Sequence, residues 1–94
     1  MIEWTEQAAR QLEQAQDYIA LSNSEAVATL VAQQILTAIE HMDAFPLSGR
    51  TGRMHRTREL VIPNTPFIAA YAIRKARIVI LALYHGAQRW PESF

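Results

Sequence analysis

The chain has 94 residues, of which 50% are hydrophobic and 19% are charged, and it contains no cysteine. This composition indicates one folded domain, residues 1–94, and excludes a disordered chain, a disulfide-stapled scaffold and a thiolate metal site. The formal net charge is zero, but residues 1–43 carry one arginine against seven carboxylates and residues 44–94 carry eight basic side chains against two. The second half can therefore present a positive surface to an anionic partner.

The N-terminal half predicts a short strand and two helices. Residues 2–4 form a candidate edge strand, and Thr5 is the expected N-cap of a helix whose apolar positions recur every three or four residues as far as Leu21. The spacing of Ser22 and Glu25 is that of a capping box, which predicts that Ser22 caps the second helix. That helix should end at Phe45-Pro46 and pack antiparallel to the first, because the link is short. Its apolar stripe is Val27, Leu30, Val31, Ile35, Ala38, Ile39 and Met42.

The C-terminal half predicts a loop, residues 46–56, followed by three strands at 58–62, 67–73 and 77–84. β-Branched and aromatic residues between turn-forming residues indicate an antiparallel meander. In the last strand Ile78, Ile80, Ala82 and Tyr84 should share one face, with Val79, Leu81 and Leu83 on the other. Both faces are apolar, so this strand should be central. The turn at 74–76 contains neither glycine nor asparagine, which leaves its type open.

The resulting fold class is α+β, in the order β-α-α-β-β-β, with a helical hairpin packed on a small antiparallel sheet. The acidic N-terminus is unlike a secretory signal, and no apolar run is long enough to span a membrane, so the expected location is the cytoplasm.

Several stretches of the sequence also resemble a known family. They are Trp4-Thr5-Glu6-Gln7-Ala8, Phe45-Pro46 followed by Gly49-Arg50, the run from Arg58 to Tyr71, and His85-Gly86-Ala87-Gln88-Arg89-Trp90-Pro91. In this order and spacing they resemble the RelE/ParE superfamily of type II toxin–antitoxin toxins over nearly the whole chain. The tail from His85 to Pro91 resembles the ParE-like branch more closely.

The resemblance implies a function and its partners. ParE-like toxins inhibit DNA gyrase, the other branch consists of ribosome-dependent mRNA endoribonucleases, and an antitoxin neutralises both. The leading hypothesis is a gyrase-binding inhibitor that is not an enzyme, needs no cofactor, and forms a hetero-oligomer with a cognate antitoxin. The alternatives are an endoribonuclease acting on mRNA at the ribosome, and a degenerate toxin that only binds an antitoxin. No metal is expected, because His41 and His55 lack metal-ligand spacing.

The candidate residues follow from charge and chemistry. Those proposed to bind the target are Arg58, Tyr71, Arg74, Arg77, His85, Arg89 and Trp90. In the endoribonuclease alternative, His85 is the acid or base, and Arg58 and Arg77 stabilise the transition state. Glu59 adjoins Arg58 on a strand and should point to the opposite face, which argues against a site that uses both. A structural interpretation stays open, with Tyr71 in the core, Trp90 as a lid on the sheet and His85 as a hydrogen-bonded strand end.

The antitoxin is expected to contact the helical hairpin, residues 5–44, and the sheet, by helix docking and strand addition. The residues proposed for this contact are Leu12, Ile19, Val27, Val31 and Ile35. The target-binding hypothesis requires that the arginines after Phe45 converge beside His85.

Overall fold

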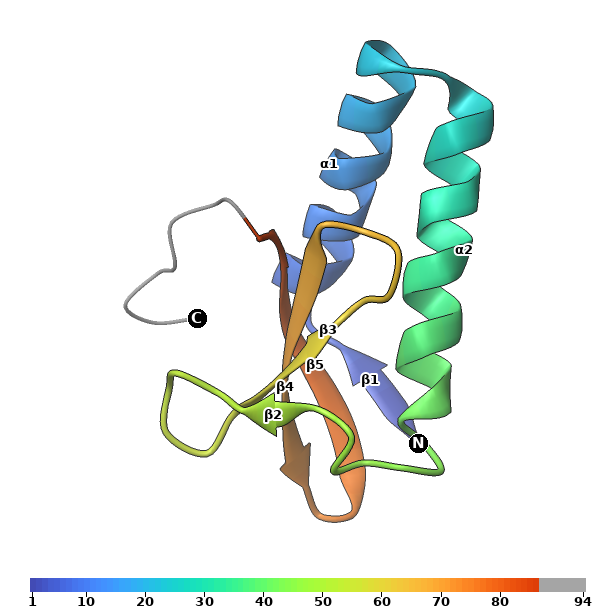
Figure 1. Ribbon diagram of the computed structural model, residues 1–94. Coiled ribbons are helices and arrows are strands. Elements are labelled where there is room, and N and C mark those ends of the chain that lie inside the picture. Colours follow the sequence, from blue (N-terminus) through green and yellow to red (C-terminus); the bar gives the residue numbers. More distant parts are fainter. Residues whose placement is uncertain (87–94) are drawn as a thin grey trace.

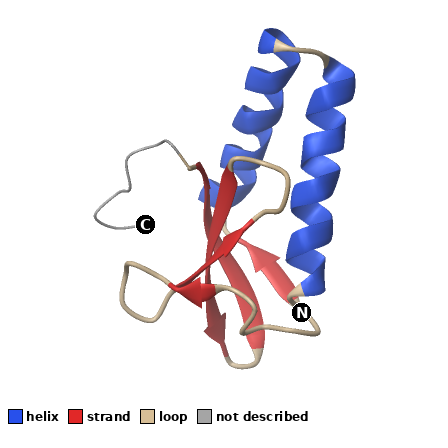
Figure 2. Cartoon of the chain, viewed as in Figure 1, coloured by secondary structure: helices blue, strands red, loops and turns tan. Residues whose placement is uncertain are grey.

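The computed structural model describes residues 1–86, which fold as a five-stranded sheet with two helices on one face (Figures 1 and 2). In chain order the elements are β1 (Ile2–Trp4), α1 (Glu6–Ser22), α2 (Glu25–His41), β2 (Arg50–Thr51), β3 (Arg58–Val61), β4 (Phe67–Arg74) and β5 (Arg77–His85). The α+β class and the predicted order of elements are confirmed. The short strand β2, inside the predicted loop, is an addition to them.

The strand order in the sheet is β1-β5-β4-β3-β2. β3, β4 and β5 form the predicted antiparallel meander, with β5 in a central position. β1 is the predicted edge strand, but it joins parallel to β5, in the register Ile2↔Ile78 to Trp4↔Ile80. The sheet is therefore mixed rather than wholly antiparallel. Hydrophobic alternation reports which residues are buried and carries no information about the direction of the neighbouring strand.

Both helices begin at a hydroxyl cap. Thr5 caps α1 as predicted, and its hydroxyl oxygen accepts from the backbone N–H three residues later at 3.1 Å. The prediction that Ser22 caps α2 is wrong, because Ser24 does so, again accepting at 3.1 Å. Ser22 is the last residue of α1 and donates its hydroxyl to the carbonyl of Tyr18 at 2.8 Å. Only one residue separates Ser22 from Ser24, so α1 uses the first serine and α2 the second.

The main core lies between the helices and the sheet. It contains Ala8 from α1, Ile35 and Ile39 from α2, Met42 at the C-cap of α2, and Phe67, Ala69, Tyr71, Ile78, Ile80 and Leu83 from the sheet. The hairpin extends past the sheet, so Tyr18 and Leu21 near its tip are 71% and 89% exposed (Figure 1). Leu30, which the sequence assigned to the buried stripe of α2, is 55% exposed. Within residues 1–86, neither helix has the length and apolar character needed to cross a membrane.

A register shift between β4 and β5 changes which side chains face the helices. Tyr71 pairs with Ile80 whereas Ala70 pairs with Ala82, so Leu81 is an extra residue in β5. Leu83 therefore joins Ile78 and Ile80 in the main core, while Ala82 and Tyr84 cluster with Ala70. The predicted division of β5 into two alternating faces is thus wrong beyond the bulge.

The β4–β5 connection is a two-residue turn. Arg74 pairs with Arg77, and the two residues between them, Lys75 and Ala76, have φ angles of 50° and 62°. Two left-handed central residues define a type I′ hairpin, whose twist matches that of the flanking strands.

The outer edge of β5 contacts α1 beyond the short β1. The Thr5 backbone N–H donates to the Ile80 carbonyl at 3.0 Å, and the Thr5 hydroxyl donates to the Leu81 carbonyl at 3.2 Å. Further along, the Leu83 N–H donates to Oε1 of Gln11 at 2.8 Å. Polar side chains of α1 thus hold the helix against the strand.

Candidate functional site

The arginine loop, residues 50–58, carries Arg50, Arg53, Arg56 and Arg58 on a turn of fixed shape. Its ends pair as β2 and β3, with Arg50 opposite Glu59 and Thr51 opposite Arg58. Between them the Gly52 N–H donates to the Thr57 carbonyl at 2.8 Å, and the Thr57 hydroxyl donates to the Met54 carbonyl at 2.7 Å. A Cβ on Gly52 would lie 2.3 Å from the Thr57 hydroxyl oxygen, so the turn requires glycine there.

A buried carboxylate anchors this loop. Glu59 is 3% exposed, and its Oε1 accepts from Nε and Nη2 of Arg50 at 3.2 and 3.0 Å. Its Oε2 accepts from the backbone N–H of Arg53 at 2.9 Å. Such charge-assisted bonds are among the stronger ones in proteins and offset the cost of burying the anion. The side chains of Arg50 and Arg53 nevertheless remain 55% and 58% exposed.

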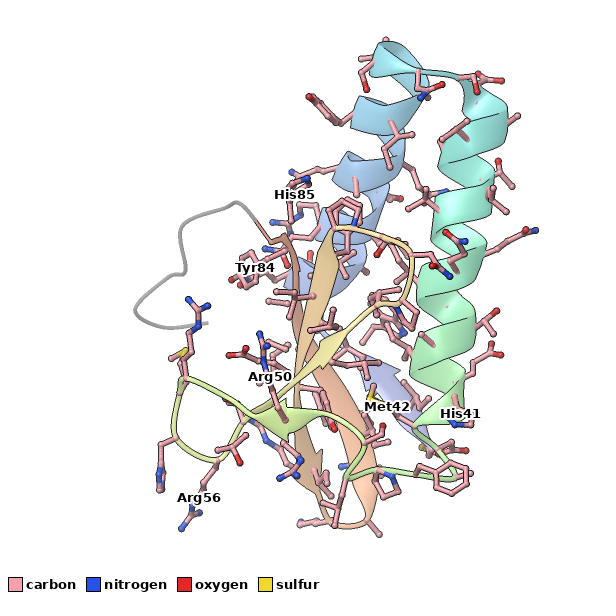
Figure 3. All side chains as sticks on the ribbon, viewed as in Figure 1. His41, Met42, Arg50, Arg56, Tyr84 and His85 are labelled. Atoms are coloured by element: carbon pink, nitrogen blue, oxygen red, sulfur yellow. The ribbon has the colours of Figure 1, made fainter. Side chains whose placement is uncertain are left out.

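The β4–β5 turn supplies further cations. Arg74 and Lys75 are exposed, and neither forms an ion pair with any of residues 1–86. Arg77 is half-buried and pairs with Glu3 of β1. Because Arg58 lies opposite Tyr71, the arginine loop extends past β3 in the direction of this turn. We call the resulting group the cationic end of the sheet, formed by Arg50, Arg53, Arg56, Arg74 and Lys75. Figure 3 labels Arg50 and Arg56 of the arginine loop.

Two of the residues proposed to bind the target, Arg58 and Tyr71, form hydrogen bonds within the protein. Nε of Arg58 donates to the Gly49 carbonyl at 3.1 Å, and its Nη2 donates to the Leu47 carbonyl at 3.5 Å. Tyr71 is fully buried, and its hydroxyl accepts from the Gly49 N–H at 2.9 Å and donates to the Pro46 carbonyl at 2.8 Å. Tyr71 therefore holds the segment after α2 in place, as the structural interpretation expected, and is not available to a target.

His85 lies at the opposite end of β5 from the cationic end (Figure 3). It is exposed, and its ring meets the edge of Phe67 at a centroid distance of 5.7 Å. Arg77 begins β5 and His85 ends it, so about 26 Å separates the two residues at 3.3 Å per residue. Arg58 lies two strands from β5 and, through Tyr71, at the level of Ile80. It is therefore offset from His85 by roughly 16 Å along the strand direction, in addition to the two strand spacings.

The structure thus does not bring together His85, Arg58 and Arg77, the set proposed for RNA cleavage. The arginines do gather, but away from His85 rather than beside it. Arg89 and Trp90 lie outside the described residues. Among residues 1–86 there is no cluster of three histidine or carboxylate side chains that could hold a metal ion.

Tyr84, beside His85, is a perturbed phenol. Burial raises the pKa of Tyr84 above its ordinary value of 10.0, and hydrogen bonds with Gln11 and Gln7 act in the opposite direction. A phenol with a raised pKa is neutral at physiological pH. The polar groups of Tyr84 and Gln11 lie near a groove between α1 and the end of β5. That groove, of about 410 Å³, is lined by Gln11, Gln14, Ala15, Tyr18, Phe67, Leu83 and His85.

A second groove lies between α2 and β3, with a volume of about 570 Å³, and we call it the α2–β3 groove. It is lined by Leu30, Gln33, Gln34, Thr37, Ala38, His41, Ser48, Leu60, Val61, Pro63 and Asn64, without an acidic, lysine or arginine side chain. Leu30 and Val61 on its two walls are 55% and 50% exposed. Through His41 and Ser48 it continues into a hollow that includes Phe45 and Leu47, which are 56% and 67% exposed. Exposed apolar surface of this extent is typical of an interaction site.

The residues proposed to bind the antitoxin lie elsewhere. Ile35 is 1% exposed, and Leu12, Ile19 and Val31 are partly buried against the main core. Val27 is half-buried. The apolar stripe of the hairpin is thus largely packed against its own protein, and these residues remain a prediction for the antitoxin contact.

The chain matches a family described as "ParE toxin of type II toxin-antitoxin system, parDE" over residues 2–90. It belongs to the ParE toxin family. A relative from Sinorhizobium fredii (strain NBRC 101917 / NGR234), named "Putative toxin Y4kP", is 40% identical over 91 residues, which cover 97% of this chain and 93% of the relative. A solved structure titled "Chromosomal ParDE TA system from P. aeruginosa" has the same fold, with a TM-score of 0.85 at 22% identity, over 89% of this chain and 92% of that one.

On this ParE-family fold the described residues offer two accessible surfaces of different chemistry. The α2–β3 groove has exposed apolar walls and no acidic, lysine or arginine side chain, whereas the cationic end is polar and positive. The excess of basic residues in the second half of the sequence pointed to a positive surface there, but not to its anchor. The only available signal for Glu59 was its position as the single carboxylate between Asp43 and Glu92.

Proposed function

We propose that this ParE-family chain is a growth-inhibiting toxin that binds DNA gyrase, and that a cognate antitoxin neutralises it by occupying the α2–β3 groove. The observation that carries the antitoxin part is an exposed, uncharged groove beside an open strand edge. Membership of a toxin–antitoxin family supports the partner, and resemblance to the ParE-like branch supports gyrase as the target. Since gyrase acts on chromosomal DNA, the proposed location is the cytoplasm.

The groove suits a segment that is apolar on one side. Its walls present Leu30 and Val61 to solvent, and its polar lining residues are neutral amides, hydroxyls and an imidazole. An amphipathic helix can bury an apolar face in such a groove, where an unpaired charge would be costly. A helical or extended antitoxin segment with apolar anchors therefore fits this surface.

The edge of β3 allows strand addition beside the groove. β2 covers β3 only at Arg58 and Glu59. The Ile62 N–H donates to the Phe67 carbonyl, so the preceding residue, Val61, directs its own N–H and carbonyl away from β4. An extended segment can pair with these groups, as partner strands do at open sheet edges.

Gyrase contact is proposed for the accessible members of the predicted set. Arg74 and His85 are exposed, whereas Arg58 and Arg77 would have to exchange the carbonyl and carboxylate contacts that they now make. Arg89 and Trp90, outside the described residues, remain part of the proposal. Arg74 and His85 lie at opposite ends of the meander, so a target that contacts both must span the length of β5.

Charge placed in the groove tests the antitoxin surface. Leu30→Glu and Val61→Glu should each weaken binding of the protein encoded in the adjacent reading frame by at least about 100-fold, because each buries an unpaired carboxylate. Leu21→Glu, at an exposed apolar position of the hairpin tip, should leave binding unchanged. Titration calorimetry with purified partners measures the three affinities. Unchanged binding in both groove variants would place the antitoxin elsewhere.

The gyrase proposal is tested with purified gyrase and supercoiled plasmid. Adding the toxin should produce linear DNA after detergent and protease treatment, and induced cells should keep their transcripts intact. Transcripts cut at ribosomal A-site codons, without plasmid breakage, would support the endoribonuclease alternative. If neither plasmid breakage nor transcript cleavage is observed, the degenerate-toxin alternative remains.

A further inference from the structure

The cationic end has a chemistry that gyrase binding alone does not require. We propose that it binds the phosphate backbone of duplex DNA without reading base sequence. This inference goes beyond the proposed function, because it adds a nucleic-acid contact to the chain itself. It rests on the arrangement of Arg50, Arg53, Arg56, Arg74 and Lys75.

The arginine loop is positive and already ordered. Glu59 neutralises one charge, while four arginines lie on residues 50–58. Arg50 donates to Glu59 through Nε and Nη2 and, with five N–H groups per guanidinium, keeps others for a ligand. The hydrogen bonds within the loop and the anchor beneath it fix the positions of these groups before a ligand arrives. Little conformational entropy is then lost on binding.

The cations come from two separate segments at one end of the sheet. The arginine loop precedes β3, and Arg74 and Lys75 belong to the turn between β4 and β5. A single carboxylate or free phosphate can contact one segment. A ligand that engages both must be extended and carry anionic groups at repeated intervals, as the backbone of a duplex does.

Few apolar anchors accompany these charges. Most of the large apolar side chains that are exposed lie on the helical hairpin, in the α2–β3 groove and in the hollow beyond it. The exceptions are Ile73 at 41%, near the turn, and Met1 at 71%, whose carbonyl accepts from the Ile78 N–H. Protein partners are held chiefly by buried aromatic and aliphatic anchors, whereas phosphate contacts need only exposed donors. The cationic end therefore favours DNA over a peptide.

Binding is measured by fluorescence anisotropy of two labelled 20-base-pair duplexes of unrelated sequence, over a series of salt concentrations. Roughly three to five phosphate contacts should give a slope of log K against log salt of about −3 to −4.5 for either duplex. The double variant Arg53→Ala/Arg56→Ala should reduce the slope by about 2 and weaken binding on the order of 50-fold at 100 mM salt. The anchor is retained in this variant, because Glu59 accepts from the backbone of Arg53.

Arg10→Ala is the matched control. It removes one cation from α1, where Arg10 pairs with Glu6 on the exposed surface, and should change neither slope nor affinity. Circular dichroism verifies that each variant is folded. Absence of binding at low salt, or a slope that the double variant leaves unchanged, would overturn the proposal. Equal competition by polyglutamate of the same charge would overturn it in favour of an acidic peptide.

The gyrase proposal is tested separately by capturing gyrase on immobilised toxin without DNA. Capture by Arg53→Ala/Arg56→Ala at the wild-type level, together with the loss of duplex binding, supports two independent contacts. Failure of the wild-type chain to capture gyrase would count against the proposed target and leave the duplex result standing.

Discussion

Replacing Ala76 by glycine should stabilise this protein. Ala76 has φ = 62° in the β4–β5 turn, where its Cβ crowds the following carbonyl at a cost of about 1–2 kcal/mol. Glycine removes that cost, but its greater conformational entropy stabilises the unfolded chain by roughly 0.5–1 kcal/mol. The net stabilisation should be about 0.5–1 kcal/mol.

Thermal unfolding followed by circular dichroism measures this effect. For a domain of this size a change of 1 kcal/mol shifts Tm by about 4–8 °C, so Ala76→Gly should raise Tm by about 2–8 °C. Ala9→Gly is the matched control, since it deletes the same methyl group from an exposed position of α1. Within a helix this deletion costs about 1 kcal/mol, so Tm should fall by about 4–8 °C.

The two variants should therefore shift Tm in opposite directions for the same chemical change. If Ala76→Gly lowered Tm as Ala9→Gly does, the left-handed conformation would not be costly, and the type I′ assignment of the turn would be wrong. Adding Lys75→Asn, which completes the preferred Asn-Gly pair, should raise Tm further.

Three other substitutions test contacts around the sheet. Gly49→Ala should lower the free energy of unfolding by about 1–3 kcal/mol in urea, because its Cβ would lie 2.6 Å from the ring of Tyr71; an unchanged midpoint would refute the tight packing. Glu59→Gln should accelerate limited trypsin cleavage of the arginine loop about tenfold, as expected if the weakened anchor is worth roughly 1.4 kcal/mol, and an unaltered rate would show that the anchor does not order the loop. The pKa of Tyr84 is raised in the folded state, so its contribution to stability is complete below pH 10 and declines as pH rises through that value. Tyr84→Phe should consequently lose less stability between pH 9 and 11 than Tyr18→Phe, as measured by urea titration at each pH.

The fold was largely predictable because burial follows local periodicity. The spacing of apolar residues identified both helices and the meander, and the hydroxyl of Thr5 marked the start of α1. The parallel direction of β1 and the bulge at Leu81 were missed because they depend on the partner strand, which alternation within one strand does not encode. β2 was missed because two residues are too few to establish a period.

The site was harder to predict, for reasons that particular residues illustrate. The apolar period that identifies a helix also identifies the side that packs on the core, so Ile35 could not serve as a partner contact as well. Glu59 was considered only in relation to Arg58, its neighbour in sequence, whereas its partners are Arg50 and Arg53. The separation of Arg77 from His85 could have been anticipated, since a single predicted strand joins them.

The contacts of Thr5 and Gln11 with β5 have a consequence for how copies of this toxin behave together. β1 pairs with β5 only as far as Ile80, and the strand continues to His85. Were its remaining edge bare, it would offer a template on which neighbouring copies could assemble into fibres. Helix α1 covers that edge of β5, so a further strand can be added to the described sheet at its other edge, where β3 continues past β2. A molecule with one accessible strand edge can add one extended segment there but cannot stack with copies of itself into an open-ended sheet.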